Sequence, residues 1–173
     1  GGQRIDITTD VFKATLDTRG ADLVRVELLR QVDPLDHSKN MVLLDQTADR
    51  LYVAQTGLVP PTGGAGLPNH HSLMKLVTAE RALKEGSNEL QVRFESDEVG
   101  GVKLLKTYTF RRSDHVIGIK HEVINMAASP TNPRLYVQLV RDGNAPAGES
   151  SFYFTFTGPA IYTDSSKFTK IDF

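Results

Sequence analysis

The sequence predicts an all-β, mostly antiparallel protein with little helix. Apolar and polar residues alternate with a period of two along most of the 173 residues, whereas the 3.6-residue period of an amphipathic helix is nearly absent. Aromatic and β-branched residues, which favour a half-buried pleated surface, are enriched in the same runs. Turn-forming residues separate the runs at intervals of about ten residues, a spacing typical of a sandwich or a barrel.

The amino-terminal strands show the alternation clearly. In residues 4–9, Ile5 and Ile7 fall on one face, and apolar residues alternate with polar ones in the same way in residues 11–18. The other strands predicted in the first half of the chain are 23–29, 41–44, 51–56 and 73–78. A short stretch, residues 79–85, has a helix-forming composition but is too short to form a stable helix alone.

Glycines and short polar segments separate these strands from those of the second half. Residues 18–22 and 84–88 each contain a glycine that can take a positive φ, and residues 97–101 and 112–114 fit short antiparallel connections. The strands predicted in the second half are 89–95, 102–111, 115–125, 135–141, 152–157 and 167–173.

Two segments interrupt this rhythm. Residues 57–71 are rich in proline and glycine, and we expect a mobile loop that buries little apolar area. Residues 142–150 are expected to form a second exposed connection. Neither segment resembles an interdomain linker, so residues 1–173 are predicted to belong to a single β-sandwich domain.

Composition excludes several classes of function. The formal net charge of −1 argues against a nucleic-acid-binding protein, which usually shows a basic stripe. Cysteine is absent, which excludes disulfides, a thiolate nucleophile and cysteine-ligated zinc. The sequence contains no apolar run of about 18 residues, the length that would predict a membrane-spanning helix.

The histidines do not predict a metal site. His70 and His71 are adjacent, and neighbouring side chains of an extended chain point in opposite directions, so a solvated pair is expected. His115 and His121 share one face of a predicted strand but lie roughly 20 Å apart, too far to share an ion. His121 is expected to pack among inward-facing residues or near an edge.

No other motif predicts a catalytic or cofactor site. The carboxylates are scattered singly, Ser150-Ser151 and Ser165-Ser166 lack the strand-to-helix elbow of a serine nucleophile, and residues 63–66 do not match a phosphate-binding loop. The sequence therefore predicts no catalytic, metal-binding or cofactor-binding residues and a protein that is not an enzyme.

A partner-contact surface is predicted in the carboxy-terminal third. Phe152, Phe154 and Phe156 share one face of a predicted strand and are expected to enter the core, which leaves Tyr153 on the outer face. Aromatic anchors with a cationic rim are common in interfaces. The candidate contact residues are Tyr153, Tyr162, Lys167 and Lys170.

Strings along nearly the whole chain point to one family. They include TTDV at 8–11, DTRGAD at 17–22, YVAQTGL at 52–58, EGSNELQV at 85–92, KTYTFRRSDH at 106–115 and FTGPA at 156–160. In this order they resemble the large periplasmic domain of the YidC family of membrane protein insertases, within the wider YidC/Oxa/Alb group. The alternation continues to Phe173, and the family's domain is longer, so the domain is expected to be truncated at its carboxy-terminal end.

The resemblance implies a fold and a function. The fold would be an antiparallel β-supersandwich similar to the galactose-mutarotase-like sandwiches, on the periplasmic face of the bacterial inner membrane. The parent protein would help to insert and fold membrane proteins, alone or with the Sec translocon and its SecDF accessory proteins. Nascent membrane proteins would be its clients. The chain itself would be a non-catalytic interaction or scaffold module that does not span the membrane.

Two alternatives remain open from the sequence. Mutarotase-like sandwiches share this architecture, so a carbohydrate-binding or sugar-active domain is the main rival; an epimerase would need His115 and His121, with a carboxylate, as its acid and base. The other alternative is a free-standing periplasmic chaperone whose groove binds extended segments. The sequence that follows Phe173 in the parent protein would distinguish these alternatives from the insertase interpretation most directly.

Overall fold

All regular secondary structure in the described part of the chain is β-strand, as predicted. The computed structural model describes residues 2–62, 64, 66–144, 156 and 158–171. The chain divides into two compact units, residues 1–140 and residues 141–173. Among the described residues, no helix is long and apolar enough to cross a membrane.

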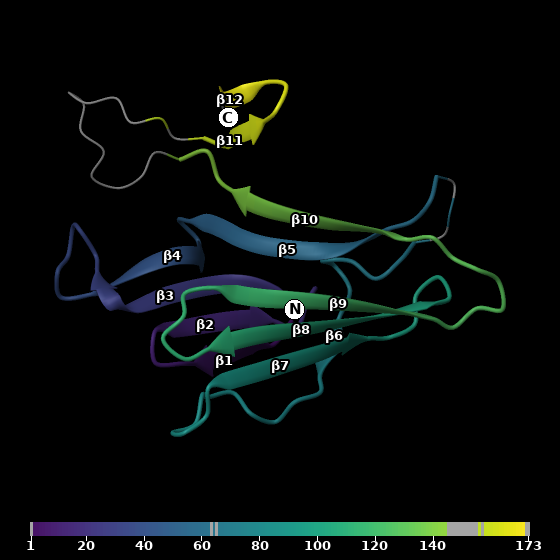
Figure 1. Ribbon diagram of the computed structural model, residues 1–173, viewed down its shortest axis with the longest axis horizontal. Helices are drawn as coiled ribbons and strands as arrows, with labels where there is room; N and C mark the ends of the chain where they lie inside the picture. Colours follow the sequence, from purple (N-terminus) through teal and green to yellow (C-terminus); the bar gives the residue numbers. More distant parts are fainter. Residues whose placement is uncertain (1, 63, 65, 145–155, 157, 172–173) are drawn as a thin grey trace. The chain divides into compact units, whose positions relative to one another are not determined.

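The first unit contains a six-stranded sheet with the order β1-β2-β3-β4-β5-β10 (Figure 1). The pairings from β1 to β5 are antiparallel, and a register shift between Thr15 and Leu16 marks a bulge in the pairing of β2 with β3. The strands of this sheet are β1 (Arg4–Thr8), β2 (Phe12–Asp17), β3 (Asp22–Val32), β4 (Asn40–Gln46), β5 (Leu51–Val59) and β10 (Arg134–Arg141).

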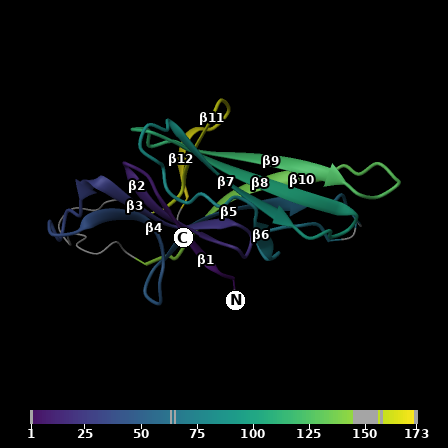
Figure 2. The same ribbon diagram turned by 90° about the horizontal axis from the view of Figure 1, so that it is seen from below.

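A four-stranded antiparallel sheet with the order β6-β7-β8-β9 completes this unit. Its strands are β6 (Met74–Leu76), β7 (Glu89–Ser96), β8 (Val102–Arg111) and β9 (Ile117–Asn125). Figure 2 shows β7, β8 and β9 lying together, apart from the group formed by β1, β2 and β3. The predicted turn glycines Gly20 and Gly86 have φ angles of 72° and 78°, which explains why glycine is required there.

Side chains from both sheets of the first unit form one hydrophobic core. Burial alternates along β1 and along β7, as the period of two predicts. The first sheet contributes the inward residues of β1, β2 and β3, and the second contributes those of β7 and β8. Among them are Ile5, Ile7, Leu16, Val26, Val92, Phe94, Leu104 and Phe110.

The second unit contains a two-stranded antiparallel sheet. Strand β11 (Ala160–Thr163) pairs with β12 (Lys167–Lys170), and Tyr162 lies opposite Phe168. The sequence predicted β12, with the range 167–173, but it did not predict β11. The predicted strand 152–157 lies outside the described residues except for Phe156, which is not part of a strand.

The expectation for residues 57–71 is wrong in one respect, because both ends of this segment are packed. Strand β5 continues to Val59, and Leu58 N–H donates to Pro68 O at 3.0 Å. Leu58 and Leu67 are buried in the core, where each stabilises the fold through apolar contacts. The prolines and glycines of the segment obscured these two positions in the sequence.

Leu67 therefore provides a test of how much this segment contributes to stability. We expect Leu67→Ala to lower the free energy of unfolding by about 2–5 kcal/mol, because it removes a core side chain and leaves a cavity. The matched control is Leu35→Ala, since Leu35 is 61% exposed, and it should change stability by less than about 0.5 kcal/mol. Equal effects of the two substitutions in urea denaturation would show that the segment is not packed.

Candidate functional site

The hairpin of the second unit brings together most of the predicted contact residues. Tyr162 and Phe168 lie opposite each other on β11 and β12, and their side chains are 66% and 63% exposed. Because directly paired residues point to the same side of a sheet, the two rings share one face of the hairpin. Phe168 was not among the predicted contact residues, although its position in an alternating run signals it.

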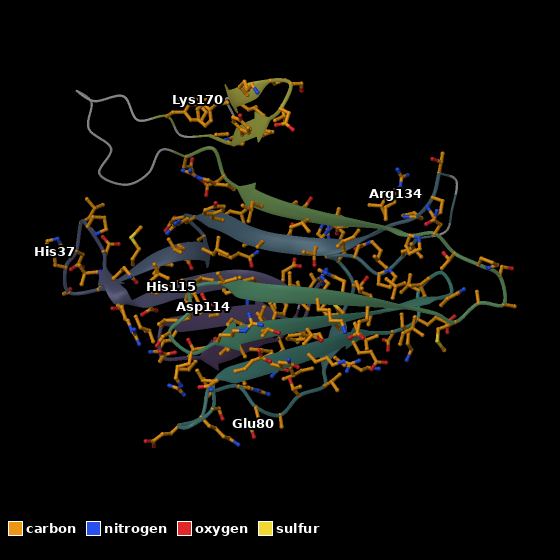
Figure 3. The ribbon with its side chains drawn as sticks, in the orientation of Figure 1. His37, Glu80, Asp114, His115, Arg134 and Lys170 are labelled. Atoms are coloured by element: carbon orange, nitrogen blue, oxygen red, sulfur yellow. The ribbon has the colours of Figure 1, made fainter. Side chains whose placement is uncertain are left out.

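Two lysine ammonium groups lie near aromatic rings in this unit. Lys167 Nζ is 6.0 Å from the centroid of the Tyr162 ring, and Lys170 Nζ is 4.9 Å from that of Phe156. These distances permit cation–π attraction. Figure 3 shows Lys170 on the hairpin. Tyr153, the fourth predicted residue, lies outside the described residues.

The histidines are placed differently from one another. His70 and His71 lie in a turn with ring centroids 3.9 Å apart, so the expectation that they point in opposite directions is wrong; it assumed an extended chain. His115, labelled in Figure 3, is exposed just before β9. Its ring packs edge-on against that of Phe12. His121 is half-buried on β9, as expected. Among the described residues, no group of three or more potential metal ligands is found.

A buried lysine is the main feature of the first unit that the sequence analysis did not identify. Lys106 on β8 is fully buried, and its Nζ donates hydrogen bonds to Gly20 O at 2.5 Å and to Thr56 O at 2.7 Å. Gly20 lies in the β2–β3 turn and Thr56 lies on β5, so the ammonium group links the second sheet to the first. A Cβ at Gly20 would lie 2.6 Å from His70 O, which excludes a larger residue there.

Further polar groups surround this ammonium. Tyr108 Oη donates to Ala21 O at 2.7 Å, next to the carbonyl that Lys106 uses. Asp22 is 4% exposed, and its Oδ2 accepts a hydrogen bond from Gln55 Nε2 at 2.7 Å. Its Oδ1 is buried and has no hydrogen-bond partner among the described residues. His121 Nε2 lies 2.8 Å from Thr56 Oγ1. We call Asp22, Lys106, Tyr108 and His121 the core polar cluster.

Burial sets the proton affinities of the core polar cluster. It raises the pKa of Asp22 to about 6, although the Lys106 charge and the Gln55 hydrogen bond oppose that rise. It lowers the pKa of Lys106 to about 8 against the opposing charge of Asp22. Burial, with a smaller contribution from the Lys106 charge, lowers the pKa of His121 to about 4, and burial raises the pKa of Tyr108 far above its usual value.

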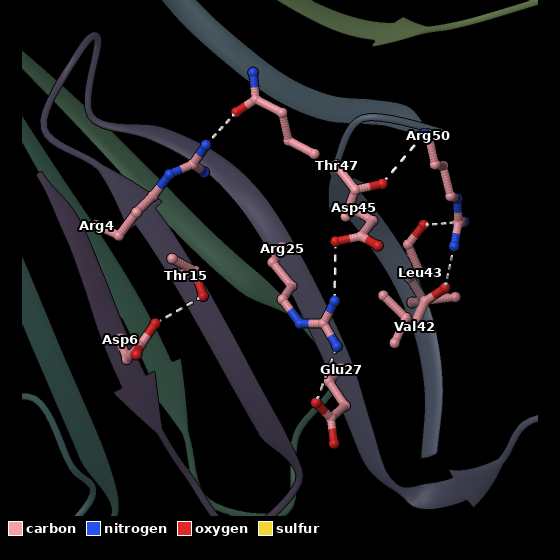
Figure 4. A network of polar contacts seen from close by, with 11 residues as sticks. Arg4, Asp6, Thr15, Arg25, Glu27, Val42, Leu43, Asp45, Thr47 and Arg50 are labelled. Carbon is pink, nitrogen blue, oxygen red and sulfur yellow. Dashed lines mark hydrogen bonds and ion pairs between the residues drawn. The ribbon is translucent and has the colours of Figure 1, made fainter. Parts of the chain in front are cut away.

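The outer face of the first sheet carries a separate polar network (Figure 4). Arg25 pairs with Asp45 at 2.9 Å and with Glu27 at 3.4 Å, while Arg4 donates to Gln46 at 2.7 Å. A shallow depression of about 360 Å³ lies over β1, β2 and β3, lined by Asp6, Ile7, Thr8, Lys13, Ala14, Thr15, Arg25 and Glu27. Because its charges are balanced and partly exposed, the network adds little stability and gives the face no net attraction for a charged ligand.

These arrangements differ in what they can do chemically. The core polar cluster has a fully buried amine, so it can bind protons and position backbone but cannot present that amine to an external molecule. The hairpin presents exposed aromatic rings beside cations, which suits a protein contact. The hairpin is therefore the better candidate for contact with another molecule.

Comparisons with known proteins agree with the resemblance noted in the sequence. The family described as the YidC periplasmic domain matches residues 4–173. The membrane protein insertase YidC of Janthinobacterium sp. is 47% identical over 98% of this chain and 29% of that protein. That of Bordetella pertussis is 45% identical over 99% of the chain and 30% of that protein. The YidC insertase of Dechloromonas aromatica is 43% identical over 99% of this chain and 30% of that protein. The chain thus spans about three tenths of the length of these relatives.

Two members of the core polar cluster, Asp22 and His121, should contribute to stability with opposite dependence on pH. The folded-state pKa of Asp22 lies above its usual 3.8, so its contribution to stability is fully present below pH 3.8 and is lost as the pH rises through about 6. The folded-state pKa of His121 lies below its usual 6.5, so its contribution is present above pH 6.5 and is lost as the pH falls through about 4. In the wild-type protein the two trends oppose each other over this range.

Single substitutions should therefore separate the two trends. For each variant we compare the difference in the free energy of unfolding between variant and wild type at pH 4 and at pH 6.5. For Asp22→Asn this difference should become more favourable to the variant by about 2 kcal/mol as the pH rises. For His121→Gln it should become less favourable to the variant by about the same amount. Leu35→Ala, which removes no titratable group from an exposed position, is the control and should follow the wild-type profile. Denaturant titrations at several pH values measure these slopes; slopes of the same sign in both variants would contradict the assignment.

Proposed function

Because the chain belongs to the YidC periplasmic domain family, on the periplasmic side of the inner membrane, we propose that it is a non-catalytic interaction module of a membrane protein insertase. Its relatives are named membrane protein insertases, and the chain corresponds to about three tenths of their length. In this proposal the parent protein inserts and folds membrane proteins, and the present chain contributes a surface on which partners dock.

The observation that carries the proposal is the hairpin of the second unit. Ile161, Tyr162 and Phe168 are all exposed there, although apolar side chains of this size are usually covered. Lys167 and Lys170 supply positive charge beside the aromatic rings. An aromatic centre with a cationic border is the composition expected of a protein contact.

The proposed partners follow from the family. The Sec translocon and its SecDF accessory proteins are the proposed docking partners, and nascent membrane proteins are the proposed clients of the parent protein. The positive charges of Lys167 and Lys170 favour an acidic surface on the docking partner, because complementary charge speeds association and orients it.

The sugar-active alternative has less support in the structure. The His121 side chain is hydrogen-bonded to the Thr56 side chain. His115 is exposed, precedes β9, and its ring contacts that of Phe12. An epimerase needs an acid and a base that converge on one accessible sheet face, and these two histidines do not converge.

Photocrosslinking in the full-length insertase tests the proposal. A photoreactive residue would replace Tyr162, Lys167 or Phe168, one position at a time. We expect crosslinks from these positions to a Sec translocon or SecDF subunit, because the side chains project from the exposed hairpin. Leu35 and Val77 are matched controls, since both are exposed on the first unit.

The control positions decide the outcome. Crosslinks from the three hairpin positions together with none from Leu35 and Val77 would support the assignment of the surface. Crosslinks to the same subunits from the control positions alone would overturn it.

A further inference from the structure

The hairpin of the second unit is a sheet of only two short strands. Strands β11 and β12, drawn in yellow in Figure 1, pair only with each other in the described part of the chain. All residues of these two four-residue strands are exposed. A two-stranded hairpin is marginally stable in water, and a third strand or a packed face is normally needed to hold it. The hairpin would therefore gain stability from another strand at one of its outer edges.

The register shows which backbone groups face the outer edge of β11. Ile171 N–H donates to Pro159 O at 2.9 Å, so these two residues form a hydrogen-bonded pair at the end of the ladder. Hydrogen-bonded and non-hydrogen-bonded pairs alternate along an antiparallel ladder. Ala160 and Tyr162 therefore belong to non-hydrogen-bonded pairs. Their N–H and C=O groups point away from β12, toward the free edge.

The two outer edges of the hairpin differ in charge. Strand β12 carries Lys167 and Lys170, and lysine on an edge strand is a common means of preventing another strand from pairing there. Strand β11 has the sequence AIYT, without charge or proline, and its isoleucine, tyrosine and threonine favour extended backbone. The edge of β11 is therefore the one better suited to accept another strand.

The side chains beside this edge define the segment that fits it. Tyr162 and Phe168 lie on one face of the hairpin, so apolar side chains at alternate positions of an added strand would pack against the Tyr162 ring. Lys167 Nζ lies 6.0 Å from the centroid of that ring, which places a positive charge close to the same edge. An acidic residue in the added segment would complement this charge.

We propose that the free edge of β11 accepts an extended segment of the docking partner as a third strand, with apolar side chains at alternate positions and an acidic residue beside them. This inference rests on the proposed docking role of the hairpin and specifies the element that binds there. Backbone hydrogen bonds at Ala160 and Tyr162 supply affinity, while the aromatic ring and the lysine supply selectivity. Binding completes a three-stranded sheet, so the hairpin is more stable when it is occupied.

Amide hydrogen exchange measured by NMR on the 173-residue chain tests whether this edge is open. Ile161 and Thr169 form a hydrogen-bonded pair of the ladder and serve as the internal reference. After correction for intrinsic rates, we expect the amides of Ala160 and Tyr162 to exchange at least threefold faster than those of the reference pair. Equal rates for all four amides would overturn the proposal. So would protection of Tyr162 that rises with protein concentration, because it would assign the edge to a second copy of the chain.

Photocrosslinking in the full-length insertase tests whether the partner uses the edge. A photoreactive residue at Phe168 reports the contact. Ala160→Pro removes an outward N–H group and no ladder bond, whereas the matched control Ala160→Val keeps that group. We expect Ala160→Pro to lower the yield of crosslinks to the docking partner at least fivefold and Ala160→Val to change it less than twofold.

A second variant guards against distortion of the hairpin by proline, which restricts φ. Replacing Tyr162 by its α-hydroxy acid exchanges the outward N–H group for an oxygen atom and keeps the side chain, and it should lower the crosslink yield in the same way. Crosslinks that persist in both variants would leave the docking role intact and overturn strand addition at β11. Absence of crosslinks from Phe168 in the insertase without either change would overturn both.

Discussion

The buried ammonium group of Lys106 is the interaction on which the first unit depends. It comes from the second sheet and donates to two carbonyl oxygens of the first, one in the β2–β3 turn and one on β5. A fully buried charge is costly unless it is hydrogen-bonded, so the positions of Gly20 and Thr56 are fixed by the need to satisfy it. The same charge lowers the proton affinity of the groups around it, so packing and protonation are linked at one residue.

This linkage explains why neighbouring groups behave unlike free side chains. Asp22 takes its unusual pKa from burial, moderated by Lys106, and His121 is held neutral by burial and by the same charge. Asp22 also connects through Gln55 to β10, at the edge of the sheet. A chain of hydrogen bonds thus connects the core polar cluster to an edge strand of the same unit.

The fold was largely predictable from the sequence because alternation is a local signal. The inward faces of β1, β2 and β7 follow directly from the period of two, and the turn glycines mark the hairpins. Lys106 was missed even though it occupies an inward position between Leu104 and Tyr108 on β8. A charged residue in an apolar register is the signal that could have found it. Its partners, Gly20 and Thr56, are distant in sequence, and no periodicity relates them.

The candidate contact surface was predictable in composition but not in geometry. Tyr162, Lys167 and Lys170 were identified from aromatic and basic residue types near the end of the chain. The hairpin that pairs Tyr162 with Phe168 was not predicted, because β11 is only four residues long and follows a glycine and a proline. The close approach of the His70 and His71 rings was missed for a similar reason: the two residues lie in a turn, where side chains do not take the opposite directions of an extended chain.

The most direct test of the central role of Lys106 is an NMR titration of Asp22 and His121 in the wild type and in Lys106→Met. Removal of the ammonium charge should raise the pKa of Asp22 above about 6 and that of His121 above about 4, because the charge now opposes protonation of both groups. If the variant folds and both pKa values stay where they are in the wild type, the Lys106 charge does not control these groups and the account is wrong.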